Sequence, residues 1–177
     1  MQPFTVFIKD RAVTIRPIVD EDASAWLDYL KQVGDETDFL AFSSEQITMD
    51  TDQARQYLEQ ASKRTDSLFL LATDDNRILA TLNFECGRWP FFRHHGEFGI
   101  SVVEEFWGCG LARIMMGTML EWATQNNVRK IHLKVRTDNH RAIHLYQSMG
   151  FSIEGMAERQ CFRPGVYYLA YHMGLKL

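Results

Sequence analysis

The sequence has no long apolar run, and this absence excludes the simplest way of crossing a membrane. None of its hydrophobic stretches reaches the roughly 20 residues that a bilayer-spanning helix needs. Residues 1–11 also lack a basic stretch followed by an apolar core and a small-residue cleavage site, the pattern of a secretory leader. From these two absences we expect a cytoplasmic protein without a membrane partner.

Cysteine is scarce as well. The chain has three, Cys86, Cys109 and Cys161, an odd number at wide spacing. They form neither a disulfide framework nor a zinc pattern, and they suit a reducing compartment. The adjacent pair His94 and His95 has no further ligands at metal-binding spacing, so we predict no metal site.

A strong excess of charge of one sign is also missing. The 19 Lys and Arg residues stand against 23 Asp and Glu, which leaves a net charge of −4 in 177 residues. Nucleic-acid-binding proteins generally carry a positive excess, so we expect no nucleic-acid partner. Hydrophobic residues make up 46% of the chain, enough for a sizeable folded core. Because there is no repeat, linker or low-complexity segment, we predict one domain over residues 1–177.

Residues 97–122 hold the most informative pattern in the chain. Apolar and small or polar residues alternate over 97–102, which is typical of a half-buried strand. Gly108 and Gly110 follow, and apolar residues then recur at helical spacing from Leu111 onward. A strand, a glycine loop and a helix form a seat for phosphate. Glycine lets the backbone approach a ligand, and the helix N-terminus offers unpaired N–H groups and a positive dipole end.

Two better-known phosphate loops do not fit this stretch. A nucleoside-triphosphatase loop requires Gly-Lys-Ser/Thr, which is absent. A dinucleotide-binding loop requires a third glycine where this chain has Arg113. For the short G-x-G-x-A pattern taken alone, the alternative is a tight turn that holds two glycines for steric reasons.

The rest of the chain is predicted to mix strands and helices without a regular βαβ alternation, which favours an α/β fold with one mixed sheet. Expected caps are Asp20, Asp50 or Thr51, and Asn139, with Gly150 just after the last helix. Extended segments are expected at 4–18, 67–73, 78–84, 130–136, 151–158 and 167–175, with a hairpin turn at 74–76. In 130–136, Ile131, Leu133 and Val135 are expected to point inward and Lys130, His132, Lys134 and Arg136 outward. Helices are expected at 21–32, from about 51 to 61, and at 140–149, and residues 33–50 are expected to be mostly loop.

A second motif makes the glycine loop informative: Asn139-x-x-Ala142-x-x-Leu145-Tyr146-x-x-x-Gly150-Phe151. Together the two motifs resemble those of the GCN5-related N-acetyltransferase superfamily. The loop is similar to that family's Q/R-x-x-G-x-G/A acyl-CoA motif, with Gly110 and Ala112 on the last two positions. One departure is Trp107 at the Q/R position, so a side-chain donor to the pyrophosphate is missing there.

The resemblance runs from about Val13 to Leu175 and implies a fold and an activity. The implied fold is α/β, with a mixed, mostly antiparallel central sheet flanked by about four helices. The implied unit is a single acyl-CoA N-acyltransferase domain, most similar to members that acetylate ribosomal proteins or small amines. A homodimer is possible on the family pattern.

The resemblance also implies site residues for acetyl-CoA. Backbone amides of Gly108, Cys109, Gly110, Leu111, Ala112 and Arg113 would bind the pyrophosphate. Val102 and Val103 would hydrogen-bond the pantetheine arm like an added strand, and Asn139 would contact the cofactor near the thioester. Asn139 is a helix cap on either interpretation.

Acetyl transfer to an amine further needs an oxyanion donor, a base and an acid. A backbone N–H on strand 97–102 is the natural donor to the thioester oxygen. Tyr146 fits the acid, because a phenol with a pKa of about 10 is protonated at neutral pH. Glu97 is the first candidate for the base, and Glu121 and His132 are weaker ones. The alternatives are a core tyrosine for Tyr146 and a solvated strand residue for Glu97.

We therefore predict an acetyl-CoA-dependent N-acetyltransferase that moves an acetyl group to a primary amine of a small molecule or peptide. The amine attacks the thioester directly, with Tyr146 as general acid. The alternative from another class is a non-catalytic acyl-CoA-binding sensor or interaction module. A different donor, such as succinyl-CoA, is a third possibility.

Two further stretches invite hypotheses. Residues 32–54 contain six acids and no Lys or Arg, so they either attract a cationic amine or form a solvated acidic loop. The cluster Trp89-Pro90-Phe91-Phe92 lies in a predicted connection. It could cover core, form a dimer patch or wall the acceptor site.

Overall fold

The computed structural model describes residues 1–75 and 77–177, and their contacts divide the chain into two compact units. The first unit comprises Met1–Glu85 and Gly99–Leu120, and the second comprises Cys86–Phe98 and Glu121–Leu177. Strand β5 (His95–Val102) and helix α3 (Leu111–Gln125) each contribute residues to both units. The prediction of one domain over residues 1–177 therefore stays a prediction.

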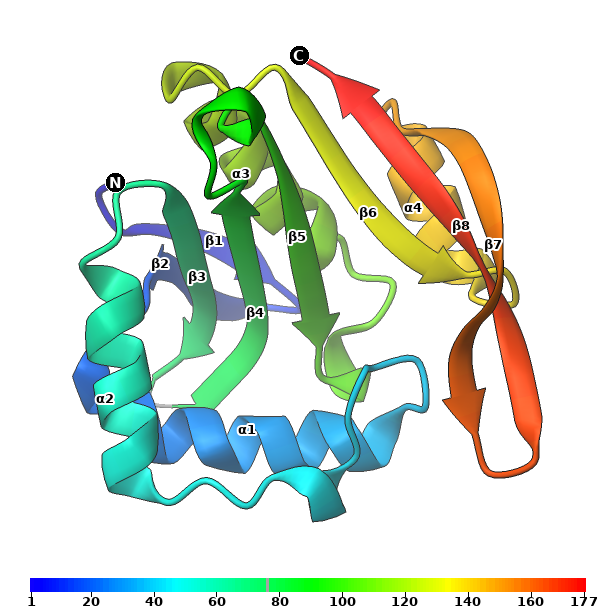
Figure 1. Ribbon diagram of the computed structural model, residues 1–177. Helices are drawn as coiled ribbons and strands as arrows, with labels where there is room; N and C mark the ends of the chain where they lie inside the picture. Colours follow the sequence, from blue (N-terminus) through cyan, green and yellow to red (C-terminus); the bar gives the residue numbers. More distant parts are fainter. Residues whose placement is uncertain (76) are drawn as a thin grey trace. The chain divides into compact units, whose positions relative to one another are not determined.

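The first unit combines antiparallel strands with helices. Its strands β1 to β4 pair antiparallel, each with the next in the chain. In Figure 1, α1 and α2 lie in front of these strands and α3 lies behind them. The bounds are β1 (Phe4–Ile8), β2 (Arg11–Pro17), β3 (Ser67–Asp74), β4 (Arg77–Cys86), α1 (Ala23–Glu36) and α2 (Thr51–Ser62). Residue 76 of the expected hairpin turn lies outside the described residues.

The core of the first unit lies on both faces of β3 and β4. These strands are buried almost continuously, because helices cover both sides of them. Helix α3 contributes a buried stripe of long apolar side chains. The fully buried members include Leu70, Leu71, Leu79, Leu82, Phe84, Leu111, Met115, Met116 and Met119.

The second unit is a smaller sheet with one helix. The first part of β5 pairs parallel with β6 (Lys130–Arg136), and β6 pairs antiparallel with β8 (Val166–Lys176). The edge strand β7 (Ser152–Arg163) pairs antiparallel with β8. Helix α4 (His140–Ser148) lies behind this sheet in Figure 1. Ile131, Leu133 and Val135 alternate with more polar residues and are buried, as predicted.

The predicted fold class is confirmed. The described residues form an eight-stranded, mostly antiparallel sheet with four α-helices. Asp50 and Asn139 cap their helices as expected, accepting from the N–H groups of Gln53 (2.8 Å) and Ala142 (3.2 Å). Gly150 follows α4 with φ +92°. Among the described residues, no helix is long and apolar enough to span a membrane.

The predicted start of the first helix is wrong by two residues. Residues Asp20–Asp22 form a 3-10 turn, and α1 begins at Ala23 rather than after an Asp20 cap. The carboxylate of Asp22 accepts two hydrogen bonds from the Arg16 guanidinium, at 2.7 and 2.6 Å, and one from the Val19 N–H at 2.9 Å. These bonds fix a tight turn before the helix, and they link residues that a local pattern does not pair.

The predicted loop over 33–50 is wrong in its first four residues, because α1 continues to Glu36. Gly34 lies inside the helix for a packing reason. A Cβ at Gly34 would lie 2.7 Å from the Ser44 backbone nitrogen, where the chain returns across the helix. Glycine is therefore needed for close approach rather than for a turn.

Arg136 was expected to point outward with Lys130, His132 and Lys134, and this is wrong. Its side chain is buried, and Nε and Nη2 donate to the two Asp138 carboxylate oxygens at 3.0 and 2.6 Å. The guanidinium carbon also lies 3.7 Å from the centre of the Tyr168 ring. A planar guanidinium can stack and donate at once, so the charge is accommodated at the end of β6.

Leu82 tests the core of the first unit. Leu82→Ala is expected to lower the free energy of unfolding by about 2–5 kcal/mol, because the fully buried side chain leaves a cavity. Urea unfolding followed by circular dichroism measures the change. Phe7→Ala is the control, since Phe7 is 81% exposed, and it should change stability by no more than about 0.5 kcal/mol. Equal losses in the two variants would contradict this core.

Candidate functional site

The predicted glycine loop lies in the first unit, just before α3. Gly108 and Gly110 have φ values of +73° and +88°, in the left-handed region that favours glycine. A Cβ at either position would meet nothing within 4 Å. Backbone conformation, and not crowding by neighbours, therefore explains both glycines.

The N-terminus of α3 opens onto this loop. The Ile114 N–H donates to the Gly110 carbonyl at 3.1 Å, so the N–H groups of residues 111–113 precede the first helical hydrogen bond. The Leu111 and Met115 side chains are fully buried and anchor this end of the helix. The N–H groups at the start of a helix and the positive end of the helix dipole together can bind an anion such as a phosphate.

The end of β5 is held by hydrogen bonds within the first unit. The Trp107 indole Nε1–H donates to the Val102 carbonyl at 2.7 Å. The Val103 N–H donates to the Leu79 carbonyl at 2.9 Å, and the Val103 carbonyl accepts from Phe106 at 2.9 Å. Trp107 stands where the acyl-CoA motif has Gln or Arg, and its indole holds the strand end. Sequence reasoning missed this bond, which no local pattern signals.

Three hydroxyl groups connect α1, β4 and β5. The Tyr29 hydroxyl lies 2.8 Å from the Ser101 hydroxyl, which lies 3.2 Å from that of Thr81. Tyr29 is only 2% exposed, and this burial raises its pKa to about 12. The network fixes the residue immediately before Val102.

Most of the acids in residues 32–54 have structural partners, among them Asp35 and Glu36 as well as the cap Asp50. Glu36 accepts from the Glu104 backbone N–H at 2.7 Å and from the Gln32 side-chain amide at 2.6 Å. Asp35 accepts from the Ser44 hydroxyl. These bonds explain both carboxylates without a ligand, which favours the structural alternative for this part of the acidic stretch.

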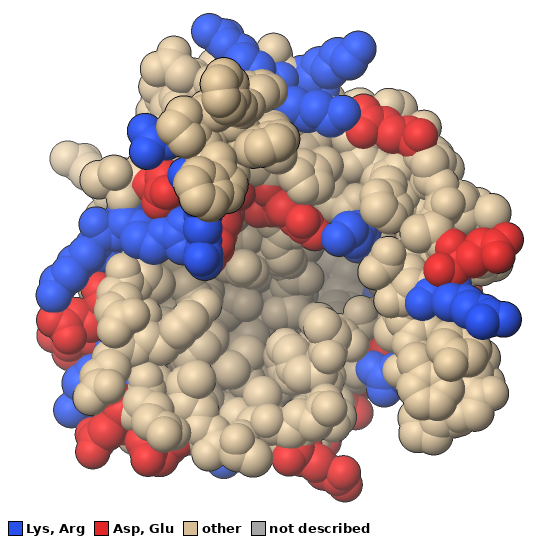
Figure 2. Space-filling model, in the orientation of Figure 1, with Lys and Arg blue, Asp and Glu red and all other residues tan. Residues whose placement is uncertain are grey.

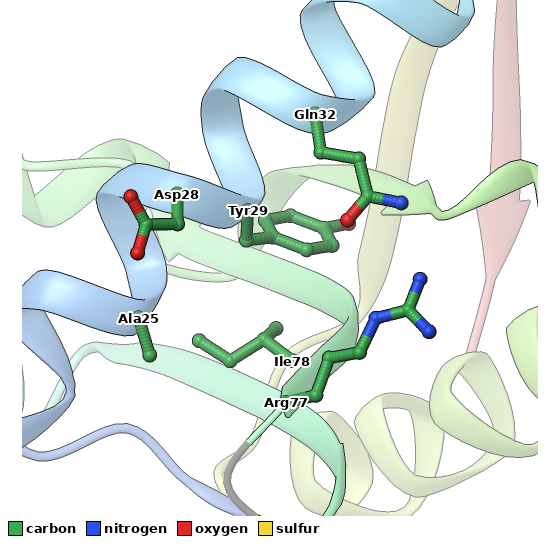
Figure 3. A pocket seen from close by; sticks show the side chains of 6 residues that line it. All are labelled: Ala25, Asp28, Tyr29, Gln32, Arg77 and Ile78. Carbon is green, nitrogen blue, oxygen red and sulfur yellow. The ribbon is translucent and has the colours of Figure 1, made fainter.

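A small hollow of about 170 Å³ lies between α1 and the start of β4 in the first unit. Figure 3 shows Asp28 and Gln32 on the helix and Arg77 on the strand around it. The Arg77 guanidinium already donates to Glu105 at 2.9 Å. No residue predicted for the acyl-CoA site lines this hollow, so we do not assign it a role in the reaction.

Glu97 and His132 meet in the second unit. They lie opposite each other in the β5–β6 register, with Glu97 Oε2 3.3 Å from His132 Nε2. The His95 ring lies 5.2 Å from that of His132. Burial foremost, and then the charges of His132, His94 and Lys130, lowers the pKa of His95. The first base candidate and one of the weaker ones thus form a pair, while Glu121 is exposed on α3.

Tyr146 lies on α4 of the second unit among aromatic rings. Its ring centre is 5.9 Å from that of Phe98 and 6.1 Å from that of Phe151. Burial raises the pKa of Tyr146 to about 12. Across residues 1–75 and 77–177, its hydroxyl has no hydrogen-bond partner. Tyr146 therefore keeps its proton at neutral pH and has a donor that the protein does not use.

Cys109 and the aromatic cluster of residues 89–92 are the last two features singled out in the sequence. The Cys109 thiol donates to the Phe106 carbonyl at 2.8 Å. Trp89, Phe91 and Phe92 are 73%, 88% and 51% exposed, so of the three alternatives for this cluster, the one in which it covers core is wrong. The three rings lie at and just before the short Pro90–Phe92 turn, which has no buried residue.

The comparisons with known proteins agree with the loop and helix geometry. The family model described as Acetyltransferase (GNAT) family matches residues 30–151. The chain is 32% identical over 116 residues to an L-amino acid N-acetyltransferase of Escherichia coli, a match that covers 65% of this chain and 72% of that protein. It is 35% identical over 78 residues to a spermidine N(1)-acetyltransferase of Vibrio cholerae, covering 44% of this chain and 45% of that protein.

A solved structure shows the same fold. It is described as an acetyltransferase of the GNAT family from Streptococcus pneumoniae. The two chains superpose with a TM-score of 0.88 at 29% sequence identity, covering 93% of this chain and 99% of the other. The likeness thus extends over nearly the whole chain.

Tyr29 provides a test of the hydroxyl network through pH. Because its pKa is about 12 in the folded chain and about 10 when unfolded, only the unfolded chain loses this proton just above pH 10. The stabilisation is complete below pH 10 and is lost as the pH rises to 12, at about 1.4 kcal/mol per pH unit. Tyr29→Phe should remove this share of the alkaline decline in urea unfolding between about pH 9 and about pH 11.5, and the share from Tyr146, whose pKa is also about 12, should remain.

The matched control is Tyr167→Phe, because Tyr167 is 59% exposed. That variant should keep the full alkaline decline. If Tyr29→Phe lost stability above pH 10 as steeply as the parent chain, burial of the Tyr29 hydroxyl would not be the cause.

Proposed function

This chain belongs to the acetyltransferase (GNAT) family and is an N-acetyltransferase, and we propose that it transfers the acetyl group of acetyl-CoA to a primary amine by direct attack on the thioester. One observation carries the proposal. Two left-handed glycines precede a helix whose first N–H groups lie before its first hydrogen bond. This arrangement suits the pyrophosphate of the donor.

The cofactor contacts follow the order of the loop. Amides of Gly108 to Arg113 bind the pyrophosphate, and Val102 and Val103 hold the pantetheine arm. The carbonyls of both valines already accept one hydrogen bond, and each has a second lone pair for the arm. Asn139, whose side chain caps α4, contacts the cofactor near the thioester.

The reaction requires a neutral amine before attack. Glu97, paired with His132, removes the amine proton, and a carboxylate–imidazole pair can share it. The amine nitrogen then bonds to the thioester carbon, and a backbone N–H stabilises the oxygen as it gains charge. The C–S bond breaks as the carbonyl re-forms, the thiolate of CoA leaves, and the nitrogen loses its second proton to become an amide.

Tyr146 protonates the leaving thiolate in this proposal. Its pKa of about 12 keeps the proton on the phenol at neutral pH. A thiol has a pKa of about 8.5, so this transfer is uphill even after the C–S bond has broken, and it is completed when the second proton of the nitrogen returns to the tyrosinate. The unpartnered hydroxyl supports this role better than it supports a purely structural tyrosine.

The acceptor is proposed to be a small amine. The relatives named above are acetyltransferases of an amino acid and of spermidine, and both acceptors carry primary amines. Because Asp35 and Glu36 are engaged within the first unit, we do not base a polycation preference on them.

Acetyl-CoA binding and turnover test the function directly. Acetyl-CoA at about 100 times its Kd should stabilise the folded chain by about 2.7 kcal/mol in thermal unfolding. Thiol release should then appear with at least one member of a panel of amino acids, polyamines and N-terminal peptides. Stabilisation without thiol release from any amine would point to a non-catalytic acyl-CoA sensor.

Tyr146→Phe tests the acid. The variant should lower kcat by about 10²–10⁴-fold, while stabilisation by acetyl-CoA stays unchanged. In the parent chain, Tyr146 should cause no loss of rate below about pH 11. Tyr167→Phe serves as the matched control. Parent-like kcat in Tyr146→Phe would remove Tyr146 from the mechanism.

Glu97→Gln tests the base through its pH dependence. The loss of kcat/KM should be about 10²–10⁴-fold near neutral pH. It should shrink as the pH rises toward the amine's own pKa, about 10, because the substrate then arrives neutral. His132→Gln should show a smaller loss with the same recovery. Glu154→Gln is the matched control, since Glu154 pairs with Lys130 at 2.8 Å. A loss in Glu97→Gln that does not depend on pH would contradict the role.

A further inference from the structure

The connection between β4 and β5 exposes three large aromatic side chains on the second unit. Trp89 is 73% exposed, Phe91 88% and Phe92 51%. The Phe92 N–H donates to the Trp89 carbonyl at 2.8 Å, which closes the short turn that displays them. Scattered exposed apolar residues are normal, but three rings in four residues form a patch that indicates an interaction site.

Exposed cations flank these rings. Arg88 precedes Trp89, and Arg93 follows Phe92. Among the described residues, neither guanidinium has a hydrogen-bond or ion-pair partner. The next cation on β6, Lys130, is by contrast paired with Glu154 at 2.8 Å. Two unpaired charges therefore lie beside the rings.

Backbone hydrogen bonds extend this group into a row. The Arg129 N–H donates to the His94 carbonyl at 2.7 Å, and the Leu177 N–H donates to the Arg129 carbonyl at 3.0 Å. These bonds bring Arg93, Arg129 and Lys176 to one end of the β5–β6–β8 sheet, where neighbouring strands are about 4.8 Å apart. Figure 2 shows Lys and Arg side chains gathered at the top of the view, where Figure 1 has the C-terminus.

We call this surface the cationic edge and define it by its cations and its rings. The Arg129 and Lys176 side chains are exposed, and no partner for either is found within the described part of the chain. The members are Arg88, Arg93, Arg129 and Lys176, with Trp89, Phe91 and Phe92. The whole chain has a net charge of −4, so this row is a local reversal of its charge.

We propose that the cationic edge binds single-stranded RNA. A strand with one phosphate per nucleotide is a linear polyanion and matches a row of unpaired cations. Unpaired bases offer flat faces, and aromatic side chains bind them by stacking whatever the sequence. A duplex hides those faces, and unpaired segments are the usual targets of proteins that recognise RNA.

Two other partners fit the edge less well. An anionic membrane is a plane, and membrane-surface segments spread their cations and apolar groups along an amphipathic helix. An acidic protein would pair with the cations but has no need of three exposed rings in one short turn. The expectation of no nucleic-acid partner was based on the net charge of the whole chain. A net charge does not report a local group of cations such as this edge.

The test is fluorescence anisotropy with a labelled single-stranded oligouridylate RNA of about 12 nucleotides, a length within the usual span of such surfaces. Binding should weaken as NaCl rises from about 50 to about 200 mM. Arg88→Ser with Arg93→Ser should weaken binding at least tenfold and reduce the salt slope by about 1.4, since each lost phosphate contact removes about 0.7. Trp89→Ala should weaken binding about fivefold or more without changing the slope.

Matched variants on the first unit provide controls. Arg55→Ser with Lys63→Ser makes the same change in charge on α2, and Phe7→Ala removes another exposed ring. Both should bind RNA like the parent chain. Equal losses in edge and control variants would overturn the proposal. So would tight binding to phosphatidylserine vesicles with no binding to RNA, or equal binding to a duplex of the same length.

The proposal does not rest on the acetyl-transfer mechanism. Thiol release from an amine, measured on the same edge variants, should stay at the parent level, because none of these residues belongs to the proposed site. A loss of RNA binding with parent-like thiol release would therefore separate the two functions.

Discussion

The end of β5 must stop pairing as a strand and turn into a loop with two left-handed residues, and the first unit is arranged around that requirement. The Trp107 indole holds the Val102 carbonyl at 2.7 Å, and Leu79 accepts from the Val103 N–H. The buried Tyr29 hydroxyl holds Ser101, one residue earlier. Glu36 caps the next turn through the Glu104 N–H. These four contacts fix the start of the glycine loop. Binding of a ligand therefore requires little further ordering of the loop.

Local patterns predicted most of the fold because the residues that decide those elements are close in sequence. The inward positions of the alternation over residues 130–136 and the caps at Asp50 and Asn139 need only their neighbours, and these predictions are confirmed. The glycine loop is equally local, since positive φ at Gly108 and Gly110 follows from residue type. The roles assigned to Glu97 and Tyr146 are different in kind. They depend on bound substrates and stay predictions.

The wrong predictions share a cause, which is contact between residues far apart or between unlike elements. Glycine is common at helix ends, but Ser44 packs against Gly34 and the helix continues past it. The alternation along β6 places Arg136 on the polar face, but its guanidinium packs on the Tyr168 ring of β8 and is buried there. Tertiary contacts override local preference at each of these positions.

Tyr29 and Tyr146 show why a shifted pKa does not identify a functional residue by itself. Burial raises both values to about 12, so the titration of the two phenols is alike. Their surroundings differ: the Tyr29 hydroxyl bonds to Ser101, whereas that of Tyr146 has no partner within residues 1–75 and 77–177. A donor already engaged by the protein stabilises the fold, and a protonated donor that is not engaged is available to a reacting group. The pattern of hydrogen bonds, more than the size of the shift, therefore distinguishes the structural tyrosine from the proposed acid.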